Sequence, residues 1–72
     1  MNYQDRIREI LATEKAEESY DPRHVEAVMR NSYGTLDNLS SDRFMEAVWD
    51  ATMEIADMGT ELAEMLAESF GL

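Results

Sequence analysis

The pattern of apolar and polar positions along this 72-residue chain predicts an all-helical fold. In three segments the apolar residues recur three and four positions apart, which is the spacing of one face of an α-helix. The predicted helices span about residues 2–18, 22–33 and 41–68. The fold class predicted is therefore all-α, with two short helices packed on one long amphipathic C-terminal helix, in a single small domain over residues 1–72.

Capping residues support these boundaries. Asn2 is placed to cap the first helix, and Ser40 is placed to cap the third. Asp21 followed by Pro22 is a strong start signal, because Asp caps a helix and Pro fits its first position. Gly34 is well placed to end the second helix in a left-handed conformation.

Gly59 is the one position inside the last predicted helix that favours a break. Both the apolar and the acidic positions continue across Gly59 without a shift of phase, so one helix over residues 41–68 is predicted, straight or bent there. Such a helix is about 42 Å long, longer than the two short helices can cover. We therefore expect a homodimeric helical bundle, formed through Ile55, Gly59, Leu62, Leu66 and Phe70.

The last predicted helix also carries an unbroken row of acids. Seven carboxylates stand three or four residues apart, which places them within about 80° of one helix face. They are Glu46, Asp50, Glu54, Asp57, Glu61, Glu64 and Glu68. Like charges at this spacing destabilise a helix by about a few tenths of a kcal/mol per pair. The row is therefore either the solvated face of a very soluble protein or a surface that meets a basic partner.

The net charge of the chain limits the kinds of partner that it is expected to bind. The net charge is −10, and it is uneven, because no Lys, Arg or His follows Arg43. Such a field repels nucleic acid and anionic membranes and attracts cationic surfaces. We expect no direct binding of nucleic acid or membrane, and a basic protein surface as the partner. No stretch resembles a signal peptide or reaches membrane-spanning length, so a cytoplasmic protein is expected.

No pattern of catalytic or metal-binding residues stands out. The chain has no Cys, and His24 alone, without a second His or a Cys, is a weak indication of a metal site. The calcium-binding EF-hand pattern and the Gly-rich phosphate loop are both absent. Acid–base catalysis needs a pocket that separates two carboxylate pKa values, which an exposed row does not offer. The sequence predicts no enzyme, no metal and no cofactor.

Trp49 and Met53 lie at the margin between the apolar and acidic positions of the last helix. They are either peripheral core or dimer contacts, or an apolar rim of the kind enriched at the centres of interfaces. The predicted partner-binding surface joins these two residues to the acids. It comprises Glu46, Trp49, Asp50, Met53, Glu54, Asp57, Glu61, Glu64 and Glu68.

About a third of the chain carries a recognisable segment. It contains His24-Val25-Glu26-Ala27-Val28-Met29-Arg30, then Tyr33-Gly34-Thr35-Leu36-Asp37-Asn38-Leu39-Ser40 and Phe44. This segment resembles small, mostly uncharacterised proteins of bacteriophages and integrated mobile elements. The resemblance implies a phage or mobile-element gene expressed in a bacterial cytoplasm, and it carries over no catalytic residue. The acidic C-terminal segment lies outside it.

Two hypotheses of function remain open from the sequence. In the first, the protein imitates nucleic acid and inhibits a nucleic-acid-binding protein such as a CRISPR effector, nuclease or repressor. Successive acids stand about 5.5 Å apart along the helix axis, on the scale of a phosphate array, and anti-CRISPR proteins are similar in being small, acidic and helical. In the second, the protein is a structural or regulatory homodimer whose acidic row is only a solvated face.

Overall fold

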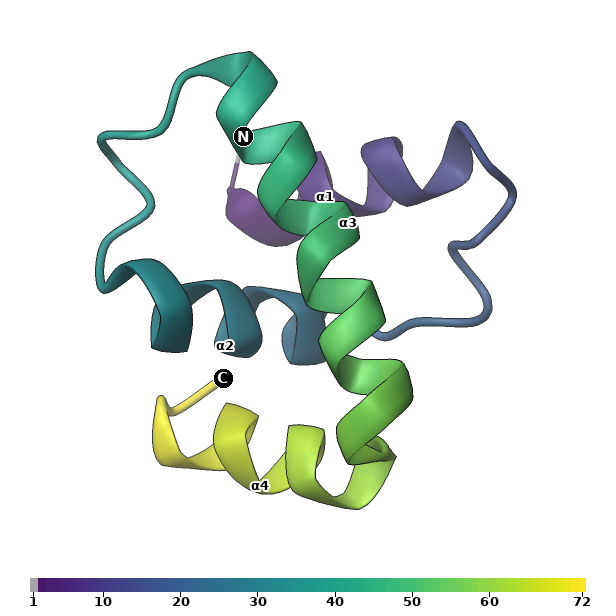
Figure 1. Ribbon diagram of the computed structural model, residues 1–72, viewed down its shortest axis with the longest axis vertical. Coiled ribbons are helices and arrows are strands. Elements are labelled where there is room, and N and C mark those ends of the chain that lie inside the picture. The colour runs from purple at the N-terminus through teal and green to yellow at the C-terminus, as the bar shows by residue number, and fades with distance from the viewer. Residues whose placement is uncertain (1) are drawn as a thin grey trace.

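The computed structural model describes residues 2–72, which form four α-helices: α1 (Tyr3–Ala12), α2 (Pro22–Tyr33), α3 (Ser41–Met58) and α4 (Thr60–Ser69). The described residues contain no strand, so the all-helical prediction is confirmed. α2 contacts each of the other three helices, whereas α1 and α4 lie apart from one another (Figure 1). Met1, part of the predicted domain, lies outside the described residues.

The predicted helix starts are confirmed by their caps. The side chains of Asn2, Asp21 and Ser40 each accept a hydrogen bond from a backbone N–H in the first turn of α1, α2 and α3. These bonds satisfy N–H groups that have no partner within the helix. Gly34 ends α2 with a φ of +78°, which is positive as predicted, but its ψ of −70° lies outside the left-handed helical region. Local chemistry thus fixes these boundaries.

α1 is shorter than predicted, because it ends at Ala12 rather than near residue 18. The chain turns at Lys15, whose φ is +56°. The Ala16 N–H then donates to the carbonyl of Leu11 at 2.9 Å, the bond that closes many helix ends after a left-handed residue. This turn returns Ala16 to the core, whereas a longer helix would extend past the apolar positions into solvent.

The prediction of one long C-terminal helix is wrong, because the helix is interrupted at Gly59. This residue has φ +91° and ψ 157°, a backbone conformation essentially restricted to glycine. Its N–H donates to the carbonyl of Ile55 at 2.9 Å and closes α3, while its carbonyl accepts from the N–H of Ala63 at 3.2 Å and opens α4. The chain turns sharply here, and α4 packs along α2 (Figure 1).

The core lies where α2 meets the other three helices. Small side chains let α4 approach, since both of its buried residues, Ala63 and Ala67, are alanines. The larger buried side chains come from the first three helices and the loop before α3. They are Ile7, Leu11, Val25, Val28, Met29, Leu36, Phe44, Val48 and Ile55. None of the helices within residues 2–72 is both long and apolar enough to cross a membrane.

The fold removes the argument that led to the predicted dimer. α2 of the same chain packs against α4 and buries Ala63 and Ala67, so this part of the apolar face does not need a second copy. Among the residues assigned to the dimer, Ile55 is buried and Leu66 packs against the core. Leu62 and Phe70 are exposed, and Gly59 forms the turn between α3 and α4. Dimerisation itself remains a prediction.

The turn at Gly59 gives a first test of the fold. Nothing lies within 4 Å of a Cβ built on Gly59, so Gly59→Ala adds backbone strain without a clash. We expect the variant to lower the free energy of unfolding by about 1–3 kcal/mol, measured by urea denaturation. Thr60→Ala, at the neighbouring exposed helical position, is the control and should change stability by less than about 0.5 kcal/mol. A Gly59→Ala variant as stable as the wild type would contradict the turn.

Candidate protein-binding surface

The break at Gly59 divides the acidic row into two groups. Four of the acids stand on α3, over a rise of about 17 Å, and they are Glu46, Asp50, Glu54 and Asp57. The other three stand on α4, which runs in a different direction, and they are Glu61, Glu64 and Glu68. The seven carboxylates therefore do not form one straight stripe.

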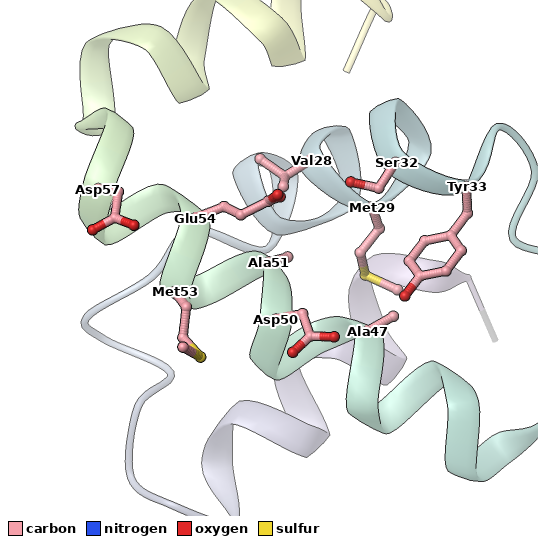
Figure 2. A pocket seen from close by; sticks show the side chains of 10 residues that line it. All are labelled: Val28, Met29, Ser32, Tyr33, Ala47, Asp50, Ala51, Met53, Glu54 and Asp57. Atoms are coloured by element: carbon pink, nitrogen blue, oxygen red, sulfur yellow. The ribbon is translucent and has the colours of Figure 1, made fainter.

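Three of the α3 acids border a groove between α2 and α3. Asp50, Glu54 and Asp57 stand on α3, and Ser32 and Tyr33 lie across the groove on α2 (Figure 2). The groove has a volume of about 370 Å³. Its floor consists of buried apolar side chains that both helices contribute. These are Val28, Met29, Ala47 and Ala51.

The charge along the groove has one sign. Of the ten side chains that line it, three are acids and none is basic. Within residues 2–72, Asp50, Glu54 and Asp57 form no salt bridge, and all three are exposed. Carboxylates held next to an apolar floor without a counter-charge attract cations more strongly than isolated carboxylates in open water.

Trp49 and Met53, which the sequence placed at the margin of the acidic row, lie in different environments in the structure. Met53 is 67% exposed and lines the groove. Trp49 is half-buried and packs against the core, as its interpretation as peripheral core anticipated. Glu46 is exposed on α3 but does not line the groove. The structure thus brings Asp50, Met53, Glu54 and Asp57 of the predicted surface together.

Glu64 occupies a different environment, because it joins α4 to α2. Its carboxylate accepts hydrogen bonds from both terminal nitrogens of Arg23, at 2.9 and 3.1 Å. Nε2 of His24 lies 2.9 Å from the same carboxylate. One nitrogen of Arg23 also donates to the carbonyl of Leu72 at 2.8 Å. Glu64 is therefore engaged within the chain, while its neighbours Glu61 and Glu68 are exposed.

The paired geometry changes the acidity of Glu64. The hydrogen bonds from Arg23, and then that from His24, lower the pKa of the Glu64 carboxyl from its ordinary 4.5 to about 2. In turn, the bond to Glu64 raises the pKa of Arg23. Sequence reasoning missed this cluster, since 40 residues separate His24 from Glu64 and only the turn at Gly59 brings them together.

No protein-family model, curated protein or solved structure matches this chain. The resemblance of residues 24–44 to phage and mobile-element proteins therefore stays a prediction. The candidate surface is supported by its own geometry and charge.

The pKa of Glu64 gives a test of the link between α2 and α4. Because the pKa is lower in the folded protein, the ionised Glu64 stabilises the fold above about pH 4.5, and this contribution is lost as the pH falls towards 2. We expect the urea midpoint of Glu64→Gln to fall less steeply over this range than that of the wild type.

Two further variants make this test specific. Arg23→Gln should raise the pKa of Glu64 towards its ordinary range, measured by carboxyl NMR titration, because it removes the largest cause of the shift. Glu61→Gln, which removes an exposed acid from the same helix, should leave the pKa of Glu64 nearly unchanged. If the urea midpoints of Glu64→Gln and Glu61→Gln depended equally on pH, this would contradict a stabilising link between Glu64 and α2.

Proposed function

We propose that this chain is a small acidic protein-binding module whose α2–α3 groove holds a basic segment of a partner protein. The observation that supports the proposal is an apolar floor beside three unpaired carboxylates, with no basic side chain in the lining. Lys and Arg side chains suit such a groove, because their aliphatic stems pack on apolar surface while their charged ends bind carboxylates. The chemistry is binding and not catalysis.

The spacing of the acids fits a short segment of the partner. Asp50, Glu54 and Asp57 follow one another at steps of four and three residues, so they recur about once per helical turn. A basic helix or extended strand that presents cations at a similar spacing would meet all three. Met53 and Tyr33, both exposed, add apolar contact at the edge of the groove.

Imitation of nucleic acid is one form that this function can take. In that form the acids replace phosphates in the basic groove of a bacterial nuclease, CRISPR effector or repressor, within a host cytoplasm. A row confined to α3 spans about 17 Å rather than the 33 Å or so of an unbroken row. The shorter row favours a compact basic segment over a long nucleic-acid channel, and competition with DNA distinguishes the two.

Matched charge variants test the groove. We immobilise the wild type, a groove variant (Asp50→Asn, Glu54→Gln, Asp57→Asn) and a control variant (Glu9→Gln, Glu14→Gln, Glu17→Gln), and expose each to bacterial lysate. Both variants lose three negative charges, and the control acids are exposed at or after α1. Three charge pairs at about 0.2–1 kcal/mol each predict that the groove variant binds its basic partner about 3- to 150-fold more weakly. The control should lose little affinity.

The pattern of retention decides the outcome. Release by high salt and displacement by competing DNA would support imitation of nucleic acid. Release by high salt without displacement by DNA would support binding of a basic protein segment. Equal weakening of both variants would show that only net charge matters, and undiminished binding in the groove variant would exclude the groove.

Exposed apolar side chains on α4 favour a second candidate, a structural or regulatory homodimer. Leu62 is 54% exposed and Met65 is 63% exposed, and they stand three residues apart on one face. In this candidate the acids are a solvated face. Light scattering of the wild type should give twice the mass of the monomer. The double variant Leu62→Gln, Met65→Gln should give the mass of a single monomer. A monomeric wild type at about 1 mM would exclude the dimer.

A further inference from the structure

A second cluster of functional side chains lies where the start of α2 meets α4. Within residues 2–72, Asp21, His24 and Glu64 place one ligand-type atom each within 4.8 Å of one another. Asp21 precedes α2, His24 stands in its first turn, and Glu64 lies on α4. The His24 side chain is only 11% exposed, so its ring is held in place rather than free in solvent.

We propose that Asp21, His24 and Glu64 form a binding site for a divalent transition metal, with Zn²⁺ as the best fit. One imidazole nitrogen with two carboxylate oxygens is a set that Zn²⁺ accepts, leaving a fourth position for water. Mg²⁺ and Ca²⁺ prefer sets made wholly of oxygen. The proposal goes beyond the binding of a basic partner, which uses different residues.

Two of the three distances between the ligand atoms are close to those around a small tetrahedral ion, and all three atoms lie within 4.8 Å of one another. Ligands about 2.1 Å from Zn²⁺ stand about 3.4 Å from one another. Nε2 of His24 lies 2.9 Å from Oε1 of Glu64 and 3.9 Å from Oδ2 of Asp21, values on either side of that spacing. Shifts of about half an ångström would bring these two pairs to it. The metal would replace the present hydrogen bond between Nε2 of His24 and Glu64.

A metal would take the place of one nitrogen of Arg23, because Nη1 now lies 3.6 Å from Oδ2 of Asp21 and 3.1 Å from Oε1 of Glu64. Asp21 would keep its helix-capping role, since it accepts the N–H of Arg23 through Oδ1, and Nη2 of Arg23 would keep its bond to Oε2 of Glu64. Arg23 would then orient Glu64 from outside the coordination shell, as hydrogen bonds to metal-bound carboxylates commonly do.

Solvent reaches the cluster through an open hollow of about 530 Å³ between α2 and α4. His24 and Glu64 line it together with Thr60, Glu61 and Met65. Glu61 is exposed and lines the same hollow. The hollow gives a metal ion an entry path, and a carboxylate at its border raises the local concentration of cations.

Metal binding at this site would tie together the parts of the chain that the turn at Gly59 joins. The three ligands come from the segment before α2, from α2 itself and from α4. The unfolded chain does not hold these residues together, so binding favours the folded state by mass action. The metal should therefore stabilise the packing of α4 on α2.

Calorimetric titration of the full chain with ZnCl₂ and with MgCl₂ tests the site directly. We expect one Zn²⁺ per chain, an increase of the thermal unfolding midpoint with Zn²⁺ that EDTA reverses, and no such increase with Mg²⁺. His24→Gln should weaken Zn²⁺ binding at least tenfold. Glu9→Gln, which removes one exposed acid from α1, is the control and should bind like the wild type.

A second variant keeps the test decisive if His24→Gln does not fold. Asp21→Asn retains the helix cap, because Asn caps a helix as well as Asp does, but it removes the ligand charge. It should also weaken Zn²⁺ binding at least tenfold while circular dichroism stays helical. Wild type that binds no Zn²⁺ up to about 1 mM would overturn the proposal. Equal Zn²⁺ affinity in Asp21→Asn and Glu9→Gln would do the same, since it would show diffuse association with the acidic surface.

Discussion

The packing of α4 on α2 is the contact on which the rest of this small structure depends. Burial of Ala63 and Ala67 removes apolar surface from water, and their small side chains permit the approach. The paired hydrogen bonds between Arg23 and Glu64 fix how α4 lies along α2, since a bidentate pair adds geometric specificity as well as energy. Glu64 is 38% exposed, so solvent screens this pair, and apolar burial is the main driving force.

Local signals predicted the parts of the fold that depend on neighbouring residues. The caps at Asp21 and Ser40 act within one turn, so the starts of α2 and α3 follow from the sequence. The groove acids on α3 also keep their predicted helical spacing. The break at Gly59 was missed, because an apolar face repeats in the same way whether it meets its own chain or a second copy. The pairing of Glu64 depended on that break and was missed with it.

The basic residues explain why the groove acids remain unpaired. All six lie before α3 or in its first turn, and three of them form salt bridges with acids outside the groove. These pairs are Arg8 with Asp5, Arg23 with Asp21 and Glu64, and Arg30 with the buried Glu26. A fourth, Arg6, lies 3.9 Å from the centre of the Phe44 ring. Within residues 2–72, the ion pairs thus engage Asp5, Asp21, Glu26 and Glu64, and none reaches the groove acids of α3.

This distribution of charge gives the two candidate sites different physical characters. In the groove, exposed carboxylates act through a field that extends over about a Debye length, so they should speed encounter with a cationic partner and respond strongly to salt. At the cluster of Asp21, His24 and Glu64, the charges already have partners, and an incoming ion must fit the spacing of specific atoms. The turn at Gly59 therefore divides one acidic sequence pattern into a surface that attracts by charge and a cluster that selects by geometry.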